Sequence, residues 1–223
     1  MTKAIGLPEV QSFSLVHELL GARLARAYGL AAPRTEVISI SSALLDAIRP
    51  DLDETGVRLD PGLAVGSELV PDLMPFAVPV HLADNELAEA AAIYVFDLLI
   101  QNPDRSLTSP NCGRVGSRIV PFDFETTFSF RLAVGRPDPW MVGELPFAKH
   151  HLFHNALKTA IVDWPFVFSQ FRALPTTVVA DVCSTIPEAW AEVADDVRAH
   201  LTSVIDHWSE FERQISKSLG RVP

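Results

Sequence analysis

The chain has 223 residues, of which 48% are hydrophobic, so it suits one large domain or two small lobes around a substantial core. Its formal net charge of -10, with the 18 Lys and Arg residues scattered along the chain, disfavours direct binding to nucleic acids. The two cysteines, Cys112 and Cys183, form neither a metal-type spacing nor a disulfide framework, which is typical of the reducing cytosol.

The first elements along the chain are a helix and a strand. We predict the helix over 15–28, with Ser14 as its cap and Gly29 as its stop. A strand is predicted over 36–40, where β-branched residues alternate with polar ones. The region 49–79 is rich in Asp, Gly and Pro, which predicts a long loop.

Short strands are predicted inside that loop, over 63–65 and 68–70. The clearest helix begins near Asp84 and ends near residue 100, and it is apolar nearly all round, so we expect it in the core. Its apolar run is too short to span a bilayer and contains Asp97. Because the N-terminus also lacks a signal pattern, we expect a cytoplasmic protein without membrane contact.

The second half of the chain is predicted to be mainly helical. A polar loop over 101–111 first leads into a tight hairpin with strands at 112–115 and 118–122. One later helix starts at Asp163-Trp164-Pro165, where proline suits the first turn. A long amphipathic helix is predicted from about 190 to 218.

The residues that carry chemistry lie between 99 and 125. The central helix leads into Asn102-Pro103-Asp104-Arg105, and the hairpin ends in Phe122-Asp123-Phe124-Glu125. Kinase-fold enzymes use this order: one Asp accepts or orients the proton of the attacking hydroxyl, and a second Asp with an Asn holds magnesium on the nucleotide. Magnesium takes hard oxygen ligands, and phosphoryl transfer depends on positioning and charge neutralisation, so a few well-placed oxygens suffice.

These segments together resemble HipA-like kinase domains, over roughly Lys3 to Phe130. The loop at 102–105 followed by Pro110-Asn111 is similar to the catalytic segment of that family, and 122–125 to its metal-binding segment. The stretch 15–33, which contains a glutamate and ends in Gly-Leu-Ala-Ala-Pro, resembles the family's first helix.

The resemblance implies a role for each of four residues. Asp104 would be the catalytic base, and Asp123 would be a magnesium ligand. Glu18 would pair with a lysine that touches the nucleotide phosphates, and Lys3 is the only basic residue upstream of the first helix.

The second magnesium ligand stays open between two residues. Kinase loops place the metal-binding Asn five positions after the catalytic Asp, and here that position is Ser109. Asn111 lies two positions further on and is the ligand that we favour.

The resemblance implies an α+β, kinase-like fold of two lobes. A reduced N-terminal lobe would comprise 1–80, and a mainly helical C-terminal lobe with the catalytic loop would comprise 81–223. The implied function is ATP- and Mg²⁺-dependent phosphoryl transfer to a hydroxyl, on a Ser or Thr of a protein substrate. Two alternatives stay open: a pseudokinase scaffold, which Ser109 and the missing phosphate-covering loop favour, and a toxin–antitoxin regulatory module without catalysis.

Overall fold

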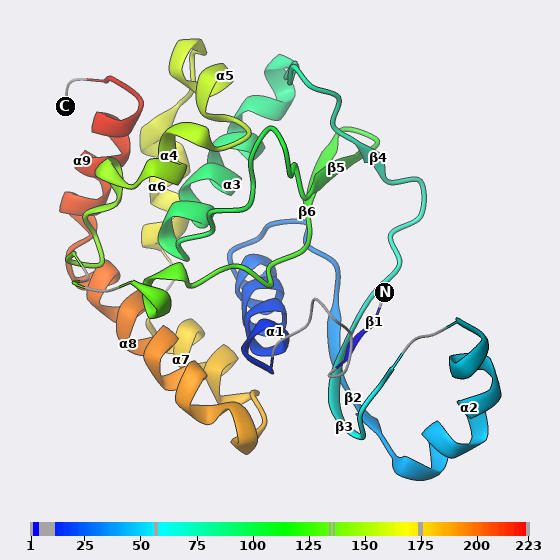
Figure 1. Ribbon diagram of the computed structural model, residues 1–223. Helices are drawn as coiled ribbons and strands as arrows, with labels where there is room; N and C mark the ends of the chain where they lie inside the picture. Colours follow the sequence, from blue (N-terminus) through cyan, green and yellow to red (C-terminus); the bar gives the residue numbers. More distant parts are fainter. Residues whose placement is uncertain are drawn as a thin grey trace.

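The computed structural model describes residues 2–4, 12–55, 58–133, 135, 137–173 and 176–221. Helices account for 54% and strands for 12%, and the strands form two small antiparallel sheets, so the fold is α+β as predicted. In Figure 1 the helices build most of the body, and the first sheet lies at its lower right. Along the described ranges, no helix combines the length and the apolar character needed to cross a lipid bilayer.

The first sheet has the strand order β1-β3-β2. Its strands are β1 (Thr2–Ala4), β2 (Thr35–Ile40) and β3 (Gly62–Ser67). The predictions for β2 and β3 are confirmed. The predicted strand over 68–70 is wrong: β3 ends at Ser67, and Pro71, which has no N–H to donate to a ladder, follows shortly after.

Helix α1 (Ser12–Ala27) packs against the first sheet and against helices from the end of the chain (Figure 1). Its predicted stop is confirmed, because Gly29 has a φ of 80°, the left-handed conformation of a helix C-terminal glycine. Its predicted start is wrong. The helix begins two residues before Ser14, which is buried inside the first turn and does not cap it.

Helix α2 (Ser42–Thr55) occupies a region where the sequence predicted a loop from residue 49. Pro50 lies inside it and removes one helical hydrogen bond, which is why the local pattern indicates a break. Leu45, Ile48 and Leu52 follow helical spacing and pack in a small hydrophobic cluster with residues of β2 and β3. This tertiary packing stabilises the helix against the cost of the proline.

The second sheet has the order β4-β5-β6. It consists of β4 (Met74–Pro75) and the predicted hairpin, β5 (Cys112–Val115) with β6 (Arg118–Pro121). The predicted central helix is α3 (Leu87–Leu99), preceded by a 3₁₀ turn. All its residues from Ala90 to Leu99 are buried, as the all-round apolar pattern indicates.

The remaining helices are α4 (Pro146–His150), α5 (His154–Thr159), α6 (Trp164–Arg172), α7 (Thr176–Ser184), α8 (Ala191–Asp206) and α9 (Trp208–Ser218). The predicted start of α6 is confirmed, since the Asp163 side chain accepts a hydrogen bond from the N–H of Phe166 at 3.0 Å. The single long helix predicted over 190–218 is wrong, because the chain leaves helical geometry at His207. The ring of His207 stacks on Trp140, with 3.6 Å between ring centroids.

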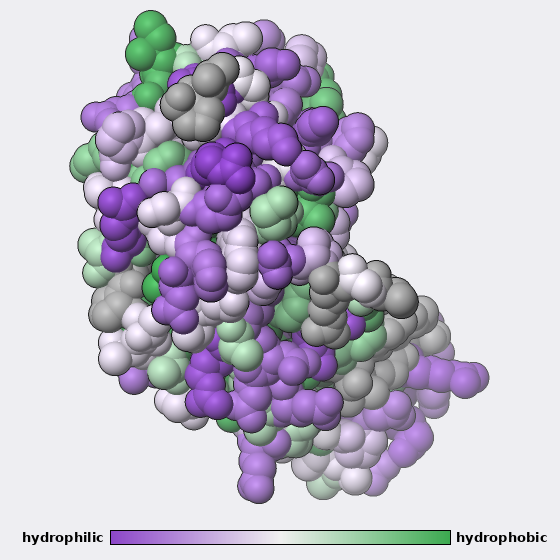
Figure 2. Space-filling model, turned by 90° about the vertical axis from the view of Figure 1, so that its left-hand side faces the viewer, coloured by the Kyte–Doolittle hydropathy of each residue, from purple (hydrophilic) through white to green (hydrophobic). Residues whose placement is uncertain are grey.

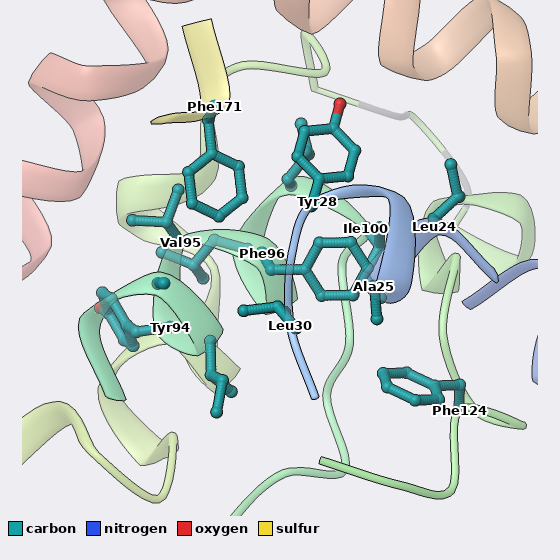
Figure 3. Packing of buried hydrophobic residues seen from close by; sticks show 14 of the residues in the cluster. Leu24, Ala25, Tyr28, Leu30, Tyr94, Val95, Phe96, Ile100, Phe124 and Phe171 are labelled. Carbon is teal, nitrogen blue, oxygen red and sulfur yellow. The ribbon is translucent and has the colours of Figure 1, made fainter. Parts of the chain in front are cut away.

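The core joins α1, α3, α6 and the segment that follows β6. Figure 3 shows Tyr28, which directly follows α1, beside Phe96 of α3 and Phe171 of α6, with centroid distances of 5.8 and 5.2 Å. Phe96 also contacts Phe124 edge to face at 6.2 Å. The core therefore fixes α1 and α3 relative to the segment around Phe124.

The surface shown in Figure 2 is mainly hydrophilic, and its hydrophobic residues are scattered.

Candidate functional site

A short polar loop leaves α3 and carries Asp104. The Nδ2 of Asn111 donates a hydrogen bond to Oδ2 of Asp104 at 2.8 Å, and Asn102 Oδ1 accepts from the backbone N–H of Asp104 at 3.2 Å. Asn111 has a φ of 43°, in the left-handed region that Asn tolerates better than most residues. The fold thus brings two of the predicted site residues into contact.

Ser109 has a different role in the same loop. Its N–H donates to Ser106 Oγ at 3.2 Å, and its carbonyl accepts from the N–H of Ser106 at 2.9 Å. These two bonds close a tight turn between Asp104 and Asn111. The geometry therefore places the side-chain amide of Asn111 against Asp104, whereas Ser109 forms the turn between them.

The β5–β6 hairpin places Asp123 beside Asn111. Cys112 pairs with Pro121, and the N–H of Phe122 donates to the carbonyl of Asn111 at 3.0 Å, so Asn111 and Asp123 both lie at the open end of the hairpin. Asp123 is half-buried and has a φ of 59°. Asp, like Asn, tolerates this left-handed conformation better than most residues.

Glu18 of α1 contacts the segment that carries Asp123, although the two lie far apart in the sequence. Its side chain is buried, and Oε2 accepts a hydrogen bond from the N–H of Phe124 at 2.7 Å. Gly21, one turn further along α1, allows this approach: a Cβ there would lie 2.4 Å from Cβ of Phe124. The helix is therefore held directly against the residue that follows Asp123.

The predicted Lys3–Glu18 pair lies outside the described side chains. The backbone of Lys3 belongs to β1, opposite Val65 of β3. Helix α1 packs on β3, so the strand that carries Lys3 and the helix that carries Glu18 share one neighbour. The pairing of the two side chains stays a prediction.

Sequence reasoning missed a buried ionic network next to the loop. Asp97 of α3 and Arg105 form an ion pair with 2.5 Å between Arg105 Nε and Asp97 Oδ2, and neither side chain is exposed. His151 contributes a further contact at 2.9 Å from Nε2 to the same oxygen. The available signal was Asp97 itself, because a carboxylate in an otherwise apolar helix needs a buried partner.

The first half of the chain matches a known protein family. The sequence profile of HipA-like kinases matches residues 5–116, half of the chain. The chain belongs to the HipA-like kinase family. The matched segment of this HipA-like kinase includes Glu18, Asp104 and Asn111 and ends before Asp123, so the placement of Asp123 rests on the hairpin. A search among curated proteins finds no match.

The side-chain oxygens of Asn111 and Asp123 in this HipA-like kinase are of the type that magnesium binds. Asn111 directs Nδ2 at Asp104, which leaves its amide oxygen on the other side, and Asp123 supplies a carboxylate at the same end of the hairpin. Magnesium commonly binds through one or two protein oxygens and takes its other ligands from phosphates and water. The described residues contain no group of three or more His, Cys, Asp or Glu side chains that could hold a metal ion.

Proposed function

We propose that this HipA-like kinase transfers the γ-phosphoryl group of ATP, with Mg²⁺, to the hydroxyl of a Ser or Thr in a protein substrate. The observation that carries the proposal is the contact between Asp104 and Asn111, at the hairpin end that also carries Asp123. The loop and the hairpin would thereby supply a carboxylate that accepts a proton and oxygens that bind a cation. Phosphoryl transfer needs these protein groups.

In the proposed reaction the acceptor oxygen attacks the γ-phosphorus. The bond from that phosphorus to the β–γ bridging oxygen breaks, ADP leaves, and the hydroxyl proton passes to Asp104. Because Asn111 binds Oδ2 of Asp104, the carboxylate is oriented before the acceptor arrives. Magnesium held by Asp123 and Asn111 would neutralise charge on the phosphate oxygens.

We assign nucleotide positioning to the N-terminal part of the chain. Residues 1–80 would act as a reduced N-terminal lobe and 81–223 as the C-terminal lobe. Lys3, paired with Glu18, would contact and orient the nucleotide phosphates. The support is the sheet β1-β3-β2 with α1 against it, and the hydrogen bond from Phe124 to Glu18 that links this half to the other.

One observation favours a second candidate, a pseudokinase scaffold. Ser109 stands where kinase loops have their metal-binding Asn, and its backbone is engaged in a turn with Ser106. A scaffold of this kind would form no ADP under any condition.

The test is ADP formation by the purified chain with ATP and Mg²⁺, in the wild type, Asp104→Asn and the exposed control Asp60→Asn. Removing a general base lowers the rate about 10²–10⁴-fold, so Asp104→Asn should lose nearly all turnover while it keeps MgATP binding. The control should match the wild type. Equal turnover in all three proteins would contradict the role of Asp104, and none in the wild type would favour the scaffold.

A further inference from the structure

Arg105 follows Asp104 in the chain, and its side chain turns inward. It is 1% exposed, and Asp97 is fully buried. Burial alone would raise the pKa of Asp97, but the Arg105 charge and the hydrogen bond from His151 hold this pKa below its usual value. The Asp97 pKa and the raised pKa of Arg105 both indicate an ionised pair. One end of the Arg105 guanidinium is therefore fixed on α3.

His151 completes the anchor without adding charge. The N–H of Phe153 donates to His151 Nδ1 at 3.1 Å, so Nδ1 carries the lone pair and Nε2 carries the hydrogen that Asp97 accepts. Burial lowers the pKa of His151, which keeps the ring neutral. The charge of Arg105 thus balances that of Asp97, whose second oxygen accepts from Asn102 Nδ2 at 2.9 Å and from Arg105 Nη2 at 3.4 Å.

The other end of the guanidinium reaches both halves of the proposed metal site. Arg105 Nη1 donates to the carbonyl of Asn111 and, at 3.3 Å, to the carbonyl of Phe122, which precedes Asp123. The guanidinium carbon also lies 5.3 Å from the centroid of the Phe124 ring. One side chain therefore connects α3 to Asn111 and to the residues on both sides of Asp123.

We propose that Arg105 is a positioning residue that sets the separation of Asp104 from Asn111 and Asp123. This inference rests on the proposed function. Arg105 has almost no exposed surface, so it acts through the backbone of the other residues and not on the substrate. Its planar fork binds Asp97 through Nε and Nη2 while Nη1 donates to the two carbonyls, whereas the single ammonium of a lysine cannot span both sides.

The first test needs no nucleotide and compares Arg105→Lys with Arg118→Lys. Arg118 lies on β6 of the same hairpin, where it forms an exposed ion pair with Glu89. The NMR signals of the Asn111 side-chain amide report its hydrogen bond to Asp104. In Arg105→Lys these signals should shift toward those of a solvated amide, and in Arg118→Lys they should stay as in the wild type. Unchanged amide signals in Arg105→Lys would overturn the inference.

The second test separates positioning from general stabilisation. ATP affinity is measured by calorimetry with and without Mg²⁺. If the wild type forms ADP, the turnover of both proteins is measured as well. Arg105→Lys should lose about tenfold or more of the magnesium-dependent affinity, as is usual when a group that orients a metal ligand is removed. Affinity without Mg²⁺ should stay unchanged, and kcat with MgATP should fall roughly 100-fold. Equal losses with and without Mg²⁺ would mean that Arg105 only stabilises the fold.

The outcomes also separate this inference from the proposed function. If the wild type shows no magnesium-dependent ATP binding, the proposed function fails, while the amide signals still decide whether Arg105 positions Asn111. If Arg105→Lys does not fold, hydrogen exchange of the Arg105 guanidinium in the wild type decides. Slow exchange is expected for donors held by Asn111 and Phe122, and fast exchange would overturn the inference.

Discussion

Glu18 of α1 accepts a 2.7 Å hydrogen bond from the backbone N–H of Phe124, the residue that follows Asp123. The two residues are 106 positions apart in the chain. Through this bond α1, which packs on the first sheet, also holds the segment that carries the proposed magnesium ligand. A change in α1 should therefore affect nucleotide binding as well as stability.

Glu18→Gln keeps an acceptor oxygen for Phe124 but removes the charge proposed to hold Lys3. We expect MgATP affinity to fall about tenfold, equivalent to about 1.4 kcal/mol, with a smaller loss in the free energy of unfolding. Calorimetry and urea unfolding measure the two quantities. Glu36→Gln, at an exposed position of β2, is the control and should change neither. A loss of stability with unchanged MgATP affinity would refute the role assigned to Glu18.

Gly21→Ala tests the close approach of α1 to Phe124. The added Cβ would lie 2.4 Å from Cβ of Phe124, so the helix must shift, and such overpacking costs about 1–3 kcal/mol. Urea unfolding should show this loss even though alanine is the better helix former. The penalty should shrink in a Phe124→Gly background, where the Cβ that the alanine would meet is absent. Strictly additive effects of the two substitutions would contradict the contact.

Asn111→Ala and Ser109→Asn distinguish the two candidate magnesium ligands. Asn111 contacts Asp104, whereas Ser109 closes a turn with Ser106. We therefore expect Asn111→Ala to abolish the gain in ATP affinity on adding Mg²⁺, and Ser109→Asn to leave that gain unchanged. If Ser109→Asn raises the magnesium-dependent affinity and Asn111→Ala has no effect, the ligand assignment is wrong.

His17 should make stability depend on pH. Burial, with a further contribution from Arg131, lowers the pKa of His17 to about 4. Below the unfolded value of about 6.5 the unfolded chain takes up a proton that the folded chain does not, so the free energy of unfolding should fall from pH 6.5 toward pH 4. The largest slope from one such group is about 1.4 kcal/mol per pH unit.

His17→Phe isolates this contribution, because the ring lies between Phe13 and Phe128 at centroid distances of 5.4 and 5.3 Å and an aromatic replacement suits that packing. Burial also lowers the pKa of His151, which adds a slope of the same sign in both proteins. Urea unfolding across this pH range should therefore give a shallower curve for the variant. Parallel curves would show that His17 does not titrate as proposed.

Local patterns in the sequence were enough to predict the elements with strong local signals. The all-round apolar run of α3 and the Gly116-Ser117 turn of the hairpin are of this kind. Helix α2 was missed because Pro50 suggests a break, and only packing against the sheet stabilises the helix around it. The break between α8 and α9 was missed because the stacking partner of His207 is Trp140, far away in the sequence.

In the candidate site, too, some residues could be predicted from local patterns and others depend on contacts made only in the folded chain. Asp104 and Asp123 could be proposed from their order around a helix and a hairpin, but the choice between Ser109 and Asn111 could not be made from spacing alone. That choice depends on the turn between Ser106 and Ser109, after which the side chain of Asn111 contacts Asp104. The role proposed for Arg105 could not be predicted either, because its contacts with Asp97, Asn111 and Phe122 exist only after folding.

The most direct test of the central claim is calorimetric titration of ATP into the wild type and Asp123→Ala, each with and without Mg²⁺. We predict that Mg²⁺ raises the ATP affinity of the wild type and leaves that of Asp123→Ala unchanged, while both proteins unfold at similar urea concentrations. Equal MgATP affinity in the two proteins would contradict the claim that Asp123 holds magnesium for phosphoryl transfer.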